Sequence, residues 1–262
     1  MRLHHTLGGN GPRVLFFNGS GATLESSSPI IDGLRSFATV LAHDQRGLGR
    51  TGIIDGPFTM AQYARDGADL LDHIGWGSCI IVGISFGGMV AQEFAVTFPE
   101  RVEKLVLLCT GAGGDAGSSY PLHENIELEP VERANKMRTI FDTRFTDEFL
   151  ANDNFAAAMA KMLRERELVD KPDDVRRGEA LQLEARRHHD VASRLGNITC
   201  PTLVMAGRYD GIAPVANSET IVTRIPGAQL RVYEGGHLFI AQDPAAMADI
   251  REFVSPTWML SN

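Results

Sequence analysis

The stretch GISFGG, residues 83–88, places one serine between glycines directly after the apolar run CIIV. Apolar side chains then recur at helical spacing over residues 86–98, which predicts a sharp turn from a strand into a helix. Such an elbow strains its central residue and leaves no space for β-carbons beside it, which explains Gly83 and Gly87. The turn exposes the hydroxyl of Ser85, and the positive end of the helix suits an oxyanion there. A GxSxG pentapeptide also arises by chance in glycine-rich chains, but in this strand–helix setting we interpret Ser85 as a nucleophile.

Composition limits the class of protein. The chain has 262 residues, 44% of them hydrophobic, which predicts one main domain with a sizeable core. Its formal charge is -8 and it has no basic block, so we expect no nucleic-acid partner and no anionic membrane surface. The first residues lack the apolar segment of a signal peptide, and no run approaches the roughly 18 apolar residues of a membrane span. We therefore expect a soluble, cytoplasmic protein.

The order of apolar runs predicts the fold class. Runs that are apolar on both faces occupy residues 13–17, 38–44, 79–84 and 104–109, and helical patterns separate them. After residue 109 a glycine-rich loop leads into a long segment with helical patterns only, and strand patterns return at residues 202–207 and 228–234. We predict an α/β fold with a doubly wound, mostly parallel sheet and an inserted all-helical cap. Residues 1–118 and 197–262 form the expected core, and residues 119–196 the expected cap.

A nucleophilic serine requires a histidine base and a carboxylate to orient it, and both follow later strands. Asp210 comes three residues after the run TLVMAG, in the turn RYDGIAP, and His237 lies in the loop GGHLF after the next run. The order Ser85, Asp210, His237 is that of the elbow-type hydrolases. In doubly wound sheets ligands bind beyond the carboxyl ends of strands, where these three residues are expected to meet.

Other residues compete for these roles. Asp115, in the loop after the fourth run, is the alternative acid, and His43, at a strand end, is the rival base. Asp210 could instead stabilise its own turn, and His237 could be a capping or core histidine.

One motif suggests a different chemistry. Residues 47–52 read GLGRTG and fit the dinucleotide-binding pattern GxGxxG after a strand, but Gly56 and Pro57 follow where that pattern must open a helix. Neither HExxH nor GxxxxGK[ST] occurs, and Cys79, Cys109 and Cys200 have no CxxC spacing, so free thiols are expected. We predict no cofactor, no metal and no disulfide.

Four stretches together resemble the α/β-hydrolase family over nearly the whole chain. They are NGSG at residues 18–21, DQRGLGRT at residues 44–51, the elbow, and the GRYD and GGH loops. The stretch FPERVEKLVLLCT is similar to the enol-lactonase and esterase branch. The resemblance implies an oxyanion hole made by the backbone N–H of Phe86 and of a residue in the NGSG loop, for which Ser20 is favoured. In that loop, formed by Asn18, Gly19, Ser20 and Gly21, an asparagine replaces the family's usual histidine, and asparagine tolerates the same turn.

We therefore predict a cofactor-free serine hydrolase that acts on a small-molecule carboxylic ester or lactone. A carbon–carbon bond hydrolase of the same family would share every motif, and a small-molecule binding protein or receptor with negligible turnover is a further alternative. In the cap, the methionines and phenylalanines are expected mainly in packing. A solvated helix face is favoured for Arg186 and Arg187 over contact with a substrate carboxylate. No motif indicates the physiological substrate or the oligomeric state.

Overall fold

A computed structural model of the protein describes residues 2–53, 56–117 and 119–255. Its centre is a seven-stranded sheet in the order β1-β3-β2-β4-β5-β6-β7, in which only β1 runs antiparallel to its neighbour. The strands are β1 (His5–Gly8), β2 (Arg13–Phe17), β3 (Thr39–His43), β4 (Cys79–Ile84), β5 (Val102–Leu108), β6 (Thr202–Gly207) and β7 (Gln229–Tyr233).

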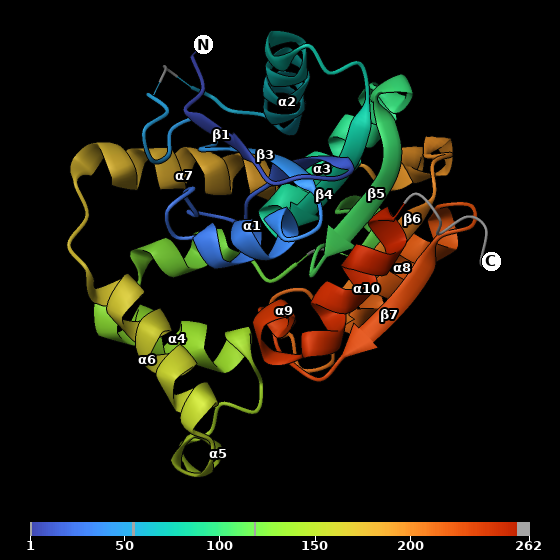
Figure 1. Ribbon diagram of the computed structural model, residues 1–262. Helices are drawn as coiled ribbons and strands as arrows, with labels where there is room; N and C mark the ends of the chain where they lie inside the picture. Colours follow the sequence, from blue (N-terminus) through green and yellow to red (C-terminus); the bar gives the residue numbers. More distant parts are fainter. Residues whose placement is uncertain (1, 54–55, 118, 256–262) are drawn as a thin grey trace.

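Helices cover both faces of this sheet (Figure 1). On one face lie α2 (Met60–Ile74), α3 (Phe86–Thr97) and α8 (Val215–Arg224), and on the other lie α1 (Ser28–Arg35) and α10 (Pro244–Val254). In β2, Leu15 and Phe17 belong to the core on the first face, whereas Val14 and Phe16 belong to the core on the second. A strand buried on both faces needs apolar residues at successive positions, so the predicted doubly wound sheet is confirmed.

β1, the strand at one edge of the sheet, lies outside the predicted runs. β1 is only four residues long, HTLG, and these residues are half-buried or exposed. Because β1 pairs with β3 alone, it needs no continuous apolar run, and its short polar sequence resembles a loop. The predicted runs at residues 13–17, 79–84 and 202–207 coincide with β2, β4 and β6.

The described residues between β5 and β6 are mainly helical. They form the 3-10 helices η2 (Gly114–Ala116), η3 (Leu122–Glu127) and η4 (Ala192–Asn197), and the α-helices α4 (Pro130–Phe141), α5 (Asp147–Asn152), α6 (Asn154–Leu168) and α7 (Asp173–Arg187). In Figure 1, α4, α5 and α6 project away from the sheet. Their small core includes Phe145, Met159 and Leu163, whereas Val131, Phe155 and Met162 are exposed. The expectation that the methionines and phenylalanines of the cap serve in packing is therefore wrong for Phe155 and Met162. The cap boundaries at residues 119 and 196 remain a prediction.

The turn at residues 44–51 is held by buried polar groups. Asp44 accepts hydrogen bonds from the backbone N–H groups of Leu24 and Arg50, and Arg46 forms a two-point ion pair with Asp66 in α2. The dinucleotide-binding pattern would require a helix that opens directly after this turn. In the described part of the chain the next helix, α2, begins only at Met60. No helix among the described residues is long and apolar enough to cross a membrane.

The elbow glycines give a test of the packing. A β-carbon on Gly83 would overlap the carbonyl oxygen of Gly87, whereas one on Gly77 would meet no atom within 4 Å. We expect Gly83→Ala to lower the free energy of unfolding by about 1–3 kcal/mol, because overpacking forces the backbone to shift. Urea denaturation followed by circular dichroism measures the change, with Gly77→Ala as the control. Equal stabilities for the two variants would contradict the close approach at the elbow.

Candidate active site

Ser85 lies at the tip of the elbow between β4 and α3, in a strained backbone conformation with φ 55° and ψ -116°. Its N–H donates to the carbonyl oxygen of Leu108 at 2.8 Å, and its own carbonyl oxygen accepts a hydrogen bond from the hydroxyl of Thr110 at 2.8 Å. These two contacts join the elbow to the end of β5. They fix the backbone, so the Ser85 hydroxyl can point out of the turn.

The structure brings the three predicted residues together. Nε2 of His237 lies 2.8 Å from Oγ of Ser85, and Nδ1 lies 2.7 Å from Oδ2 of Asp210. The other carboxylate oxygen of Asp210 accepts from the backbone N–H groups of Ile212 and Ala213. An ionised carboxylate can only accept, so the Nδ1 of His237 carries the proton and its Nε2 is left to accept from the Ser85 hydroxyl.

The competing candidates lie elsewhere. Asp115 is exposed and pairs with Arg224 at 2.9 Å, and this arginine lowers the pKa of the Asp115 carboxyl. His43 is buried with its ring against Phe17, and burial lowers its pKa to about 4. Within the described residues, neither side chain hydrogen-bonds to Ser85 or His237.

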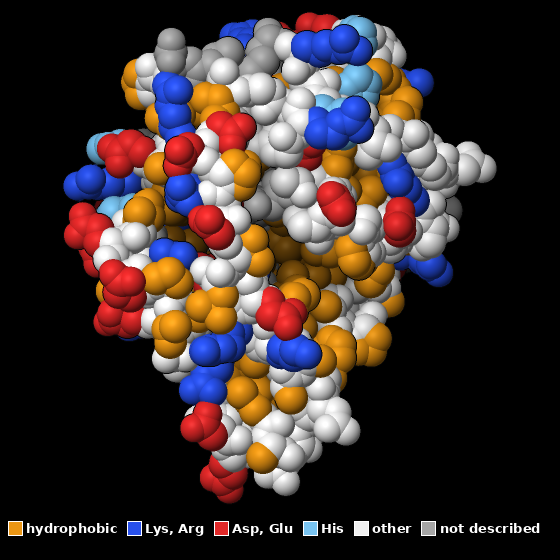
Figure 2. Space-filling model, turned by 90° about the vertical axis from the view of Figure 1, so that its left-hand side faces the viewer, with side chains coloured by type: hydrophobic (Ala, Val, Ile, Leu, Met, Phe, Trp, Pro, Cys, Tyr) orange, Lys and Arg blue, Asp and Glu red, His pale blue; other side chains and the backbone are white. Residues whose placement is uncertain are grey.

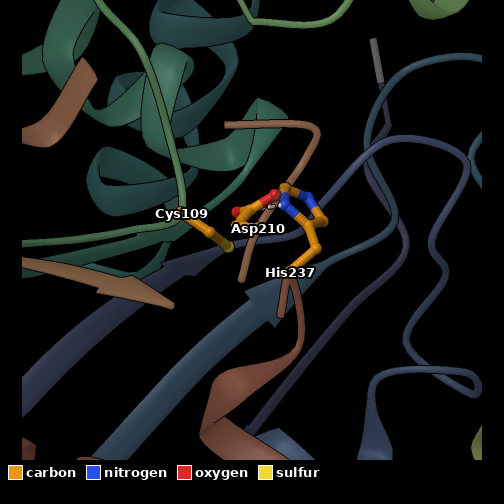
Figure 3. Close-up of side chains that lie close together, drawn as sticks. All are labelled: Cys109, Asp210 and His237. Carbon is orange, nitrogen blue, oxygen red and sulfur yellow. Dashed lines mark hydrogen bonds and ion pairs between the residues drawn. The ribbon is translucent and has the colours of Figure 1, made fainter. Parts of the chain in front are cut away.

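Cys109 is a neighbour of this site that the sequence did not suggest. Its sulfur lies within 4.8 Å of one polar atom of Asp210 and one of His237. Figure 3 shows the three side chains lying close together. Burial, with the Asp210 charge nearby, raises the pKa of the thiol well above its usual value, so it stays neutral. A metal ion would need a thiolate, and it would break the hydrogen bond between Asp210 and His237, so these residues suit proton transfer better than metal binding.

The NGSG loop lies beside the nucleophile. A β-carbon on Gly19 would be 3.7 Å from that of Ser85, and the Gly21 N–H donates to Oε1 of Gln182 in α7 at 2.7 Å. Asn18 is fully buried, and its backbone carbonyl oxygen accepts a hydrogen bond from Nε2 of Gln45 at 2.6 Å. Phe86 begins α3, where a backbone N–H has no acceptor within the helix. The roles of Phe86 and Ser20 as oxyanion donors stay predictions.

The end of α4 joins the acid loop to the base loop, which the sequence did not indicate. The carbonyl oxygen of Phe141 accepts from the N–H of His237 at 2.6 Å, and that of Ile140 accepts from the N–H of Gly211 at 2.9 Å. The ring of Phe141 also meets the imidazole of His237 edge-on, with centroids 5.8 Å apart. The chain that leaves α4 therefore holds the loops of the acid and the base in one arrangement.

A second set of contacts supports the base loop from the same place. Gln242 accepts from the N–H of Gly236 at 2.8 Å and donates to the carboxylate of Asp142 at 2.8 Å. Asp142 is fully buried and also pairs with Arg144 at 2.7 Å. Gln242 and Asp142 are 100 residues apart in the sequence, so no local sequence pattern indicates their contact. Of the supporting side chains named above, Thr110, two residues after the end of β5, lies at a position where strand-end reasoning could find it.

Arg186 and Arg187 differ in their surroundings. Arg187 is half exposed and lies 3.8 Å from Glu184, whereas Arg186 is only 6% exposed, so the expectation of a solvated face is wrong for Arg186.

Figure 2 shows a hollow on one face of the molecule with hydrophobic side chains inside and charged side chains around it.

Comparison with known proteins gives similarities in sequence and in fold. A family model described as alpha/beta hydrolase fold matches residues 12–244. A poly(3-hydroxyalkanoate) depolymerase of Ectopseudomonas oleovorans is 32% identical and the match covers 90% of this chain and 82% of that protein. A 3-oxoadipate enol-lactonase of Acinetobacter baylyi is 27% identical over 90% of this chain and 85% of that one.

Two further proteins complete the comparison. A 2-hydroxymuconate semialdehyde hydrolase of Pseudomonas putida is 32% identical, and the match covers 87% of this chain and 82% of that protein. The crystal structure of a hydrolase from Pseudomonas aeruginosa is similar with a TM-score of 0.79 and 28% identity, over 95% of this chain and 93% of that one.

The support of the base loop can be tested on stability. We expect Gln242→Leu to lower the free energy of unfolding by about 1–3 kcal/mol, because the buried carboxylate of Asp142 and the N–H of Gly236 each lose a partner. Gln229→Leu is the control, since Gln229 is half-buried and no side-chain hydrogen bond is found for it among the described residues. Guanidinium denaturation of both variants measures the difference, and a Gln242→Leu protein as stable as the control would refute the role of these contacts.

Proposed function

The chain belongs to the α/β hydrolase fold family, and from this premise we propose that it is a serine hydrolase that cleaves a carboxylic ester or lactone through an acyl-enzyme on Ser85. The observation that carries the proposal is the hydrogen-bonded series of Ser85, His237 and Asp210, with 2.8 Å and 2.7 Å between successive polar atoms. A serine hydroxyl is a weak nucleophile near neutral pH, and this arrangement provides the base that activates it.

In the proposed first half of the reaction, Nε2 of His237 takes the hydroxyl proton of Ser85 as Oγ attacks the substrate carbonyl carbon. The carbonyl π electrons move to oxygen and give a tetrahedral oxyanion. When the oxyanion re-forms the carbonyl, the bond to the leaving oxygen breaks, and His237 returns its proton to that oxygen. In a lactone the leaving oxygen belongs to the same molecule, so ring opening gives an acyl-enzyme that carries a hydroxyl group.

Water completes the cycle in the second half. His237 takes a proton from the water molecule, the hydroxide oxygen attacks the acyl carbon, and the proton returns to Oγ of Ser85 as the acid leaves. Asp210 keeps His237 in the tautomer that accepts from Ser85 and stabilises the imidazolium in both halves. The two backbone N–H groups at Ile212 and Ala213 support this role, because their hydrogen bonds to one carboxylate oxygen of Asp210 fix the direction in which the other oxygen points.

The position of Phe86 supports an oxyanion hole. Its N–H lies in the first turn of α3, where the helix dipole also favours negative charge. Gly19 is packed against Ser85, and the second donor is proposed from the same loop at the N–H of Ser20. A single oxyanion donor contributes on the order of 10²–10³ in kcat in a well-studied protease, so this loop has a large share in the proposed mechanism.

The names of the relatives support the choice of substrate class. The depolymerase and the enol-lactonase are named for reactions at ester and lactone bonds, and the first is 32% identical to this chain. The 2-hydroxymuconate semialdehyde hydrolase, at 32% identity, favours carbon–carbon bond hydrolysis as the second candidate. Both reactions fit the same three residues, so only substrates distinguish them.

A substrate panel tests the proposal. We expect wild-type protein to hydrolyse p-nitrophenyl acetate and butyrate and to open simple lactones. The p-nitrophenyl esters should give a burst of p-nitrophenol, because an acyl-enzyme accumulates before water attacks it. Ser85→Ala should lose this activity, and circular dichroism shows whether the variant is folded. Turnover of a dienoate-type ketone, with no ester or lactone hydrolysis, would favour the second candidate, and no turnover of any substrate would favour a binding protein.

The choice of acid is tested by two matched variants. We expect Asp210→Asn to lower kcat by about 10⁴, because an amide favours the wrong tautomer of His237 and does not stabilise the imidazolium. The same substitution has an effect of this size in a serine protease with the same three residue types. Asp115→Asn should change kcat by less than about twofold, since Asp115 pairs with Arg224 at the surface. Measurement of both on one ester, with circular dichroism as a check on folding, decides between them. Loss of activity in Asp115→Asn alone would overturn the assignment.

A further inference from the structure

A cavity of about 250 Å³ lies between α3, α7 and the loops that follow β5. The side chains of Met89, Ser119, His123, Arg186 and His189 are among those that line it. Among the described residues of the lining, none is a carboxylate, whereas two are arginines and two are histidines. The charged side chains that line the cavity therefore carry an excess of positive charge.

The guanidinium of Arg186 is buried at this cavity. Arg186 is only 6% exposed, and its Nε and Nη2 atoms have no hydrogen-bond partner among the described residues. Burial lowers its pKa to about 10, and no neighbouring charge contributes to that pKa. At neutral pH the group is still protonated, so the site holds a largely buried cation that has no ion-pair partner in the described part of the chain.

Such an arrangement is costly unless a ligand completes it. A buried, uncompensated charge costs several kcal/mol, and proteins bury arginines almost only when they are paired. Three further side chains at the cavity also have unused hydrogen-bonding capacity, because Oγ of Ser119, Nδ1 of His123 and both ring nitrogens of His189 have no partner in the described residues. Burial lowers the pKa of His189 to about 4, so its imidazole is neutral and adds no second charge. The buried Arg186 cation and these polar groups match a single small anion with oxygen acceptors.

The cavity lies close to the nucleophile. Met89 is one turn of α3 beyond Ser85, which is a rise of about 5–6 Å along the helix. On α7, Gln182 contacts Gly21 of the NGSG loop, and Arg186 is one turn further along the same face of the helix. Ser85 and Met89 are thus one helical turn apart on α3, and Arg186 is one turn from the residue of α7 that contacts the oxyanion loop. A substrate that reaches from the nucleophile to the cavity therefore needs only a short chain of carbon atoms.

We propose that this cavity binds a carboxylate of the substrate, and that the preferred ester or lactone carries an acidic group a few carbon atoms from its scissile carbonyl. This inference rests on the proposed hydrolysis at Ser85. A carboxylate suits the site because an arginine binds its two oxygens with two parallel hydrogen bonds, and the remaining lone pairs can accept from Ser119 and His123. The volume, below that of a drug-sized pocket, limits the acidic part to a short chain.

The test compares a charged ester with a neutral ester of the same shape. Monoethyl glutarate is paired with ethyl 5-methylhexanoate, in which two methyl groups replace the carboxylate oxygens, and the monoethyl esters of succinate and adipate vary the chain length. We expect wild-type protein to favour a charged member of the series in kcat/KM. In Arg186→Met this preference should fall about 30-fold or more, mainly through KM, the size of effect that loss of a buried charge pair produces.

Two other arginine variants make the comparison specific. Arg186→Lys keeps the charge but not the two-point contact and should retain part of the preference. Arg176→Met is the matched control, since Arg176 is an exposed arginine on the same helix that pairs with Asp170. An equal preference in wild type and Arg186→Met, for every chain length, would overturn the inference.

A binding experiment separates this inference from the proposed function. In calorimetry, Ser85→Ala should bind glutarate but not glutaramide, which is the neutral control. The double variant Ser85→Ala/Arg186→Met should not bind glutarate, and circular dichroism shows whether it is folded. If the diacid binds in this way but no ester or lactone is hydrolysed by wild type, the carboxylate site stands and the hydrolase proposal fails. If neutral esters are hydrolysed and the diacid does not bind, the hydrolase proposal stands and the carboxylate site is refuted.

Discussion

The close approach of α3 to the sheet at the elbow is the constraint on which the rest of the site depends. A β-carbon on Gly87 would overlap the carbonyl oxygen of Phe17 in β2, so only glycine lets the helix begin directly at the strand end. The strain falls on Ser85, whose φ of 55° is uncommon for a residue with a side chain. Its N–H donates to Leu108 and its carbonyl oxygen accepts from the Thr110 hydroxyl, and these hydrogen bonds help to hold the conformation. The packing of β2, β4, β5 and α3 therefore fixes where the hydroxyl lies.

The other parts of the site are held against this fixed point by the chain between β5 and β6. The end of α4 contacts the acid loop through Ile140 and the base loop through Phe141. On the opposite side, α7 contacts the NGSG loop through Gln182 and places Arg186 in the cavity. The helical segment therefore has two roles: one end keeps the acid and the base together, and the other provides the charge that we propose selects the substrate.

Much of this arrangement could be predicted from sequence because its signals are local. The apolar runs reveal the parallel strands, and Ser85, Asp210 and His237 each follow one of them within a few residues, at the edge where strand ends meet. The contacts of Asp142 with Gln242 and of Gln182 with Gly21 join residues 100 and 161 apart, so no local pattern reveals them.

Two features of the fold escape prediction for different physical reasons. The sequence favours a solvated Arg186 because charge on a helix usually faces water, and only the packing of α7 against the core shows that it is buried. The edge strand β1 has four residues, half-buried or exposed, and so short a segment carries no periodic signal.

The central claim is that the fold activates one serine through His237. A fluorophosphonate reacts covalently with an activated serine hydroxyl and hardly at all with an ordinary one, so its adducts can be counted by intact-mass spectrometry and located by peptide mapping. We predict one adduct per chain, on the peptide that contains Ser85, and more than about 10³-fold slower labelling in His237→Ala, because activation by the base is lost. Labelling at another residue, or at the same rate in His237→Ala, would contradict this claim.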